Sequence, residues 1–267
     1  MKYLIAIAFL GAIGLSVQTA NASLIFSDDF NGYTDGALGS SDINPGTSTG
    51  WSGGSASITV ASGTLSYTGL TTAGTNMLSI ANGTAGSVYT TYANQTSGQI
   101  FYSFLFEPTT VDSANTYFTA LNPGTTAPGG SGDAIDAYYY SNGKIEVRGN
   151  AQSASAGSGA ALTIGTTYLI VEELNLSTGA GSLWIDPNSS SFGGSAPTPT
   201  ATLSSLTATA IDNIGFKAQT GTGDFDIGDV LIGTTWADVT PTPEPSVLAL
   251  AGAGLGLVGM LRFRRRS

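Results

Sequence analysis

The chain has 267 residues, of which 18 are acidic and 8 are basic, and it contains neither histidine nor cysteine. The absence of these two residue types excludes Ser-His-Asp and Cys-His nucleophilic sites, disulfides and ordinary structural zinc sites. Only 10% of the residues are charged, yet 41% are hydrophobic and 9% are aromatic, and 37 are glycine. Disordered chains are poor in aromatic residues, so this composition predicts a folded, turn-rich, all-β protein.

Residues 1–22 have the pattern of a secretory signal peptide. Lys2 supplies a positive charge near the start, and residues 3–17 are almost wholly apolar. The small residues Ala20 and Ala22 occupy positions −3 and −1 of the expected cut after Ala22. The alternative interpretation is a buried core helix. We expect export and a mature chain that begins near Ser23.

Residues 23–239 contain short apolar runs separated by turn residues, and we expect them to form one domain. Asn142-Gly143 separates two of these runs, which is the strongest local signal for a hairpin. Many short strands at this spacing predict a two-sheet antiparallel β-sandwich. The expected strands lie at residues 57–60, 65–67, 87–92, 100–106, 134–140, 144–148, 168–176, 183–185, 211–217 and 225–232.

Three segments carry a family resemblance. They are SDDFNGY at residues 27–33, YLIVEE with GSLWIDP between residues 168 and 187, and DFDIGDVLIG at residues 224–233. Together they resemble the concanavalin A-like, laminin G-like jelly roll. The resemblance implies that the first and last strands lie side by side, with Asp28-Asp29 near residues 224–229.

Asp224, Asp226 and Asp229 form a D-x-D-x-x-D pattern in the last expected strand. Alternation puts Asp224 and Asp226 on one face, and a bulge at Gly228 would turn Asp229 to the same side. Several carboxylates on one side suit Ca²⁺, which takes 6–8 oxygen ligands. The alternative is a solvated strand face that discourages edge pairing. Calcium is the one cofactor that the sequence suggests.

The same segment is similar to the E-x-D-x-x-E strand of laminarinase-type glycoside hydrolases, in which one carboxylate attacks the sugar and another protonates the leaving group. Both glutamate positions are aspartate here, which shortens their reach. Glu172 and Glu173 are consecutive, so in a strand they face opposite ways and cannot act as a pair. We therefore expect no enzymatic activity and keep a carbohydrate-active enzyme as the alternative.

Aromatic residues offer a second kind of site, because flat rings suit the apolar faces of sugars. Trp51 lies beside glycines, which favours exposure, and among the consecutive tyrosines 138–140 at least one ring should point outward. Trp51, Tyr138 and Tyr140 are therefore the candidates for a glycan platform. Core packing is the alternative for all three.

Residues 240–246 form a proline-rich spacer, and residues 247–267 form an apolar segment that ends in basic residues. Fifteen apolar residues in a helix span roughly 22 Å, less than a ~30 Å hydrocarbon core, and the basic end should stay cytoplasmic. Pro243, Glu244 and Pro245, the apolar helix and the basic cluster of Arg262, Arg264, Arg265 and Arg266 resemble the PEP-CTERM sorting signal. That resemblance implies a Gram-negative bacterium, an exosortase that removes the tail, transient inner-membrane association, and delivery to the cell surface or extracellular matrix. An ordinary single-span anchor is the alternative.

Basic residues are scarce in the exported part. Between residues 23 and 242 they are Lys144, Arg148 and Lys217, against 17 acidic residues. Such a domain repels nucleic acid and anionic lipid, so we expect no nucleic-acid partner. The sequence favours a structural or adhesive surface protein that binds extracellular polysaccharide, with a calcium-dependent adhesion module as a further alternative.

Overall fold

The computed structural model describes residues 24–243, apart from residues 40–41, 45–48, 73, 112–113, 125–126, 129–131, 150–153, 158, 205 and 222. The expected signal peptide, the apolar tail and the sorting-motif residues from Glu244 onward lie outside the described residues. Within the described ranges, no helix has the length and apolar character needed to cross a membrane.

Strands dominate the described part of the chain. The short helical elements there are η2 (Ser189–Ser191) and α1 (Trp236–Val239). The strands are β1 (Leu24–Asp28), β2 (Gly36–Gly39), β3 (Ser52–Ser62), β4 (Asn76–Ile80), β5 (Gly86–Gln95), β6 (Gln99–Pro108), β7 (Thr116–Asn122), β8 (Ile135–Tyr139), β9 (Ile145–Gly149), β10 (Ala154–Gly157), β11 (Tyr168–Asn175), β12 (Ala180–Ile185), β13 (Ala201–Leu203), β14 (Ile211–Ala218) and β15 (Phe225–Gly233).

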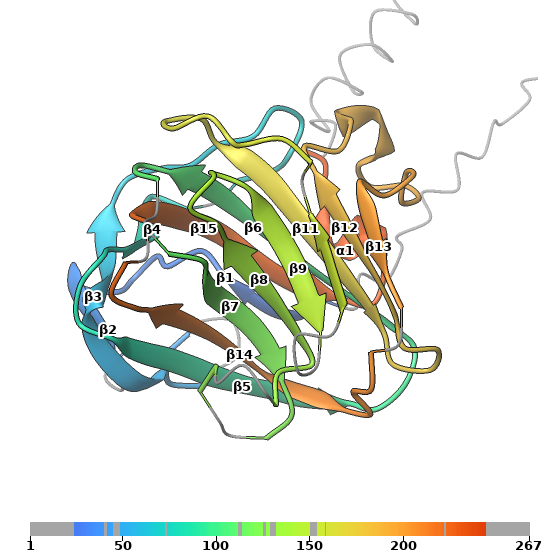
Figure 1. Cartoon of the computed structure of the whole chain (residues 1–267), viewed down its shortest axis with the longest axis horizontal. Coiled ribbons are helices and arrows are strands. Elements are labelled where there is room, and N and C mark those ends of the chain that lie inside the picture. The colour runs from blue at the N-terminus through green and yellow to red at the C-terminus, as the bar shows by residue number, and fades with distance from the viewer. Residues whose placement is uncertain are drawn as a thin grey trace, which may run out of the picture.

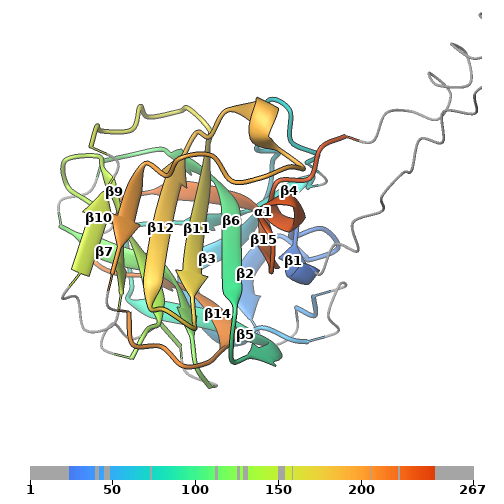
Figure 2. The same ribbon diagram turned by 90° about the vertical axis from the view of Figure 1, so that its right-hand side faces the viewer.

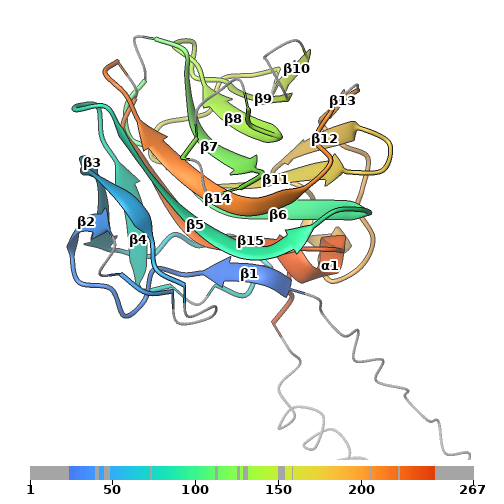
Figure 3. The ribbon, with the colours of Figure 1, turned by 90° about the horizontal axis from the view of Figure 1, so that it is seen from below.

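The strands form two antiparallel sheets that pack face to face (Figures 1 and 3). One, here called the β6 sheet, has the order β3-β4-β15-β6-β11-β12-β13, with β1 beside β15 and β2 beside β3. The other, the β8 sheet, has the order β10-β9-β8-β7-β14-β5-β3. The all-β antiparallel sandwich expected from the sequence is therefore present.

Strand β3 belongs to both sheets and closes one edge of the sandwich. Its start pairs with β5 at Ser52 and Gly53, and its end pairs with β4. Gly53 has φ +89°, and a Cβ there would lie 2.3 Å from the carbonyl oxygen of Ser87. Only glycine fits this crossing. At the opposite edge β10 and β13 approach each other (Figure 2).

The main core lies between the two sheets and is rich in aromatic rings. Phe106 contacts Phe118, Tyr139 and Phe225 with ring centroids 5.1–5.5 Å apart. A second, smaller apolar cluster covers the outer face of the β6 sheet, where Trp184 and Trp236 lie 5.1 Å apart. Helix α1 supplies Trp236.

Several local predictions are confirmed. Strand β1 pairs with β15, with Asp28 opposite Val230, so the first and last strands are neighbours. The hairpin at Asn142-Gly143 joins β8 to β9, and Gly143 takes a left-handed φ of +76°. Glu172 points into the sandwich and Glu173 points out of it. Residues 65–67, expected as a strand, are instead a loop over the β6 sheet.

Candidate functional site

The three aspartates of β15 point to different places. Asp226 is half-buried on the outer face of the β6 sheet, between Ser79 of β4 and Glu107 of β6. Burial, together with the nearby charges of Glu107 and Asp224, raises its pKa. Asp224 accepts a hydrogen bond from the backbone N–H of Asn82 at 2.6 Å.

Asp229 occupies the predicted bulge. Its φ is +43°, and the register with β6 shifts between Gly228 and Leu231. Its carboxylate lies near Gly74, whereas Asp224 lies at the Asn82 turn. Across the described part of the chain, no group of three acidic side chains is placed to hold a metal. The calcium set of Asp224, Asp226 and Asp229 therefore has no geometric support here.

Trp51 is part of the core, which corrects its prediction as an exposed platform. It is 1% exposed, and its ring packs against Phe26 and Phe216. Its indole N–H donates to Asp28 at 3.1 Å, and the Tyr33 hydroxyl donates to the same carboxylate oxygen at 2.7 Å. The flanking glycines permit the β3 crossing and do not expose the ring. Asp28, Tyr33 and Trp51 are called the Asp28 cluster below.

The three consecutive tyrosines are all buried, which corrects the second part of that prediction. Tyr139 points into the core and contacts Phe106 and Phe225. Tyr138 and Tyr140 point to the outer face of the β8 sheet but are only 4% and 8% exposed. Arg148 of β9 covers them, with its guanidinium carbon 4.3 Å from one ring centroid and 5.3 Å from the other. Tyr138 and Tyr140 therefore form a floor beneath Arg148 and present no bare platform.

Further aromatic and basic side chains share this outer face. Tyr117 of β7 lies opposite Tyr138, with ring centroids 5.6 Å apart. Lys217 of β14 donates to the Tyr117 hydroxyl and lies 4.2 Å from its ring centroid. Lys144 precedes buried Ile145, so alternation puts it on the outer side. We call this set the tyrosine–cation face; its members are Tyr89, Tyr117, Tyr138, Tyr140, Lys144, Arg148 and Lys217.

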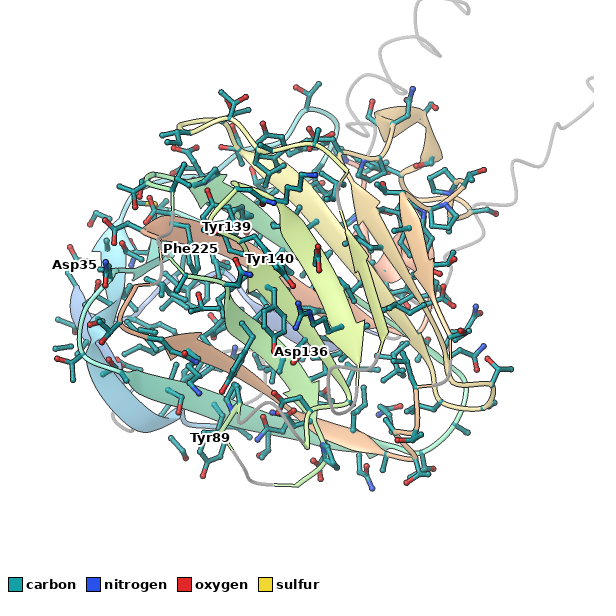
Figure 4. The ribbon with its side chains drawn as sticks, viewed as in Figure 1. Asp35, Tyr89, Asp136, Tyr139, Tyr140 and Phe225 are labelled. Carbon is teal, nitrogen blue, oxygen red and sulfur yellow. The ribbon has the colours of Figure 1, made fainter. Side chains whose placement is uncertain are left out.

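The surface runs across several strands of the β8 sheet. Tyr89 of β5 is half-buried and pairs with Gly215 of β14. A Cβ at Gly215 would lie 2.4 Å from the ring of Pro128, so glycine lets the loop before β8 rest on the sheet. Figure 4 locates Tyr89 on β5, and Asp136 and Tyr140 along β8.

Several polar atoms of this face have no hydrogen-bond partner among the described residues. They include Oδ1 of Asp136, the hydroxyl of Tyr140 and Nε of Arg148, and these three atoms are buried. Arg148 reaches Glu146 at 3.8 Å, which is a long contact for an ion pair. Buried polar groups normally find partners because leaving one unpaired costs about 1–3 kcal/mol. These atoms are therefore unsatisfied within the described part of the chain.

Asp136 is the acidic residue under this face. It is 2% exposed and lies directly opposite Arg148 in the β8–β9 register. Burial, followed by the charge of Asp133, raises its pKa to about 7, while Arg148 opposes the shift. Near neutral pH this carboxyl group therefore exchanges between a hydrogen-bond donor and an acceptor.

A second carboxyl lies in the sandwich interior. Glu172 of β11 is 1% exposed, and its Oε1 has no partner among the described residues. Burial, followed by the charge of Asp136, raises its pKa to about 8. It also raises the pKa of Tyr102 in β6, where burial is the larger cause. Glu172 is enclosed by the core, so it does not contribute to a surface site.

A polar groove of about 450 Å³ lies on the other side of the molecule. Tyr67 and Asp186 form part of its wall, with Thr167 and Asn188. Asp186 has a left-handed φ of +49° and accepts a hydrogen bond from the backbone N–H of Leu169 at 3.1 Å. Burial raises the pKa of Asp186. The groove is a second surface on which a sugar could rest.

The residues that sequence reasoning missed are Tyr117, Asp136 and the groove pair Tyr67 and Asp186. The scarcity of basic residues between residues 23 and 242 was the available signal, because Lys144, Arg148 and Lys217 are the whole basic set of that range. Their convergence on one face depends on strand order, since β14 inserts beside β7 from far along the chain.

The comparisons with known proteins give likeness of fold at low identity. No protein-family model matches the chain, and no curated protein matches it either. A solved sialidase is 14% identical with a TM-score of 0.47, over 80% of this chain and 19% of that one. The globular domain of T. cruzi calreticulin is 9% identical with a TM-score of 0.47, over 91% of this chain and 100% of that one.

A SAP-like pentraxin from Limulus polyphemus is 14% identical with a TM-score of 0.38, over 56% of this chain and 70% of that one. The chain thus spans about a fifth of the length of the sialidase that it resembles. Because these TM-scores lie below 0.5, the sandwich is assigned from the strand pairing of this chain alone.

Proposed function

We propose that the protein is an exported, non-enzymatic β-sandwich that binds extracellular polysaccharide at the cell surface or in the matrix. The observation that carries the proposal is the tyrosine–cation face. It combines partly exposed Tyr117 with buried polar atoms of Tyr140 and Arg148 that lack partners among the described residues, and Asp136 beneath the face has one such atom too. Sugar-binding sites combine aromatic faces with a few fixed polar groups.

The position of the chain ends supports the same proposal. Strand β1 and helix α1, which begin and end the described domain, lie together on the side away from β8, β9 and β10 (Figure 3). We propose that a PEP-CTERM tail, cut by an exosortase, sorts the protein to the surface. A chain held at its C-terminal end would then present the tyrosine–cation face outward.

A carbohydrate-active enzyme is the rival from another class. The favouring observation is the cross-strand pair of Asp226 and Glu107, because directly opposite residues have Cβ atoms about 4.5–5.5 Å apart. Glu107 already accepts a hydrogen bond from Thr167 at 2.6 Å. Sugar release that is lost in Asp226→Asn would favour the rival. A calcium-dependent module would instead show thermal stabilisation by Ca²⁺ that a chelator reverses.

The test of the proposal is co-sedimentation of the full-length chain with the extracellular polysaccharide of the producing cells. We expect saturable binding that falls at least tenfold in Tyr117→Ala, because that ring is the partly exposed aromatic of the face. The matched control is Tyr67→Ala in the groove, which should bind like the wild type. Absence of binding would refute the proposal, and loss confined to Tyr67→Ala would move the site to the groove.

A further inference from the structure

We infer that the tyrosine–cation face takes a saccharide that carries a carboxylate, that is, a uronic-acid residue of an acidic polysaccharide. The inference rests on the proposed function and names the ligand class of the same face. It runs against the net charge of the domain, which by itself favours cations or neutral polymers.

The first support is the distribution of basic residues. The exported part has three basic residues against 17 acidic ones, and all three lie on the outer face of the β8 sheet. Lys217, Arg148 and Lys144 come from three separate places in the chain. Acidic residues thus outnumber basic ones over the domain, and the basic ones share a face with the unpartnered atoms of Tyr140 and Arg148.

The second support is the state of Arg148. Its guanidinium lies over Tyr138 and Tyr140, its Nε has no partner among the described residues, and its contact with Glu146 is 3.8 Å long. A guanidinium has five N–H donors in a planar fork that matches a carboxylate bidentately. The Tyr138 and Tyr140 rings lie against the guanidinium, and its Nε donor has no partner among the described residues.

Two acidic residues lie close to Arg148 and limit what it can bind. Asp136 is buried below the surface, and Glu146 is partly exposed beside it. A ligand carboxylate must replace Glu146 at the guanidinium, which the long contact permits. Lys217, held against Tyr117, supplies a second positive charge to the same surface.

The small number of basic residues points to an acidic sugar and away from nucleic acid. Binding to a nucleic acid uses many phosphate contacts, typically 6–10, whereas this face has three basic side chains and aromatic rings between them. One or two carboxylates on a stacked sugar match that number. The acidic residues elsewhere on the domain repel a polyanion from the other faces.

The experiment compares matched acidic and neutral ligands on the full-length chain. The probes are oligomers of glucuronate, galacturonate and mannuronate, each measured against its own carboxyl-reduced form by calorimetry. We expect at least one oligouronate to bind at least tenfold more tightly than its reduced form, and added salt to weaken that binding.

The variants are Arg148→Gln, Arg148→Lys and Lys217→Gln. Arg148→Gln should lose at least tenfold in affinity, Lys217→Gln several-fold, and Arg148→Lys should recover part of the loss because it keeps the charge. Lys217 is only half-buried, so Lys217→Gln tests the inference even if Arg148→Gln does not fold. The thermal midpoint is recorded for each variant. Oligouronate binding that none of these variants changes would overturn the inference.

The remaining outcomes separate the inference from the proposed function. Equal binding of acidic and reduced oligomers, lost in Tyr117→Ala, would overturn the acidic ligand and leave polysaccharide binding standing. Binding of the producing cells' polysaccharide without binding of any oligouronate would do the same. Binding of neither the oligomers nor the polysaccharide would overturn both.

Discussion

The Asp28 cluster and the tyrosine–cation face use the same kinds of side chain and differ in how well these are satisfied. At Asp28 the carboxylate accepts hydrogen bonds from Phe30 N–H, Tyr33 and Trp51. At Asp136 one carboxylate oxygen has no partner among the described residues, nor have the Tyr140 hydroxyl and the Nε of Arg148.

The carboxyl groups of Asp28 and Asp136 are both buried, so exposure alone does not distinguish them. A buried carboxylate stabilises the fold when its oxygens all accept hydrogen bonds from neighbouring donors, because each of these groups would be costly to leave unpaired. A cluster with unmatched atoms on an outer sheet face stabilises less and leaves bonds for a ligand. The difference predicts that the first cluster controls stability and the second controls binding.

The largest effect should come from a third unmatched group, Glu172. Its pKa is about 8 in the fold against an ordinary value of 4.5, so the folded chain holds the extra proton between these values. Stability is therefore fully present below about pH 4.5, falls as the pH rises toward 8, and levels off above. The slope is at most about 1.4 kcal/mol per pH unit for one group.

Glu172→Gln should flatten this pH dependence, since it removes the ionisable group from the core. Urea unfolding at pH 5, 7 and 8.5 measures the change in the free energy of unfolding. Glu173→Gln is the matched control, because Glu173 lies outside the core and accepts a hydrogen bond from Gln99. Equal slopes in the wild type and Glu172→Gln would contradict the assignment.

The next effect concerns Asp28. Asp28→Ala leaves the hydroxyl of Tyr33 and the N–H of Phe30 without their acceptor, and leaves the indole N–H of Trp51 only its bond to the Tyr33 hydroxyl. We expect the free energy of unfolding to fall by about 3 kcal/mol, at 1–3 kcal/mol for each unpaired buried group after partial relaxation. Chemical denaturation measures it.

Asp35→Ala serves as the control for that change. Asp35 is exposed and accepts one hydrogen bond from Ser62, so its loss should stay within about 0.5 kcal/mol. If both substitutions lowered the free energy of unfolding by the same small amount, the Asp28 cluster would not have the stabilising role that distinguishes it from the tyrosine–cation face.

Some of the strand pairings that position these two clusters could be predicted from the sequence. The alternating runs on either side of Asn142-Gly143 correctly predicted the β8–β9 hairpin, and the resemblance to the concanavalin A-like jelly roll correctly predicted that β1 and β15 pair. Both features depend on neighbours in sequence or on a motif pattern. Strand β7 was not predicted, because nearly all of its residues are buried and its pattern does not alternate.

The pairing of Asp136 with Arg148 could not be predicted, for a specific reason. A two-residue turn at Asn142-Gly143 would place Tyr140 opposite Ile145, but the structure places Tyr139 there. The N–H of Tyr140 bonds to the carbonyl of Lys144, so the loop has one more residue, with Gly143 left-handed. This one-residue difference decides which side chains meet across the strands.

The prediction that Trp51 is exposed was wrong for a different reason. Its neighbours Gly50, Gly53 and Gly54 suggest an open turn, yet they serve the passage of β3 between the sheets. Whether an aromatic ring is covered depends on segments far along the chain, here Phe216 of β14. Local composition carries no information about that cover.

The smallest effect gives the sharpest contrast, because it compares the same chemical change in both clusters. Tyr33→Phe removes a hydroxyl that donates to Asp28 at 2.7 Å and accepts from Trp51 at 3.2 Å, so we expect a loss of about 1.5 kcal/mol. Tyr140→Phe removes a buried hydroxyl that has no partner among the described residues, so stability should stay unchanged or rise by up to about 1 kcal/mol.

The effects on oligouronate affinity should be reversed between the two variants. We expect the affinity to be unchanged in Tyr33→Phe and reduced about threefold in Tyr140→Phe. Thermal unfolding and calorimetry on the two variants measure both quantities. If Tyr140→Phe destabilises the fold as much as Tyr33→Phe and leaves affinity untouched, the outer face of the β8 sheet is structural in the same sense as the Asp28 cluster.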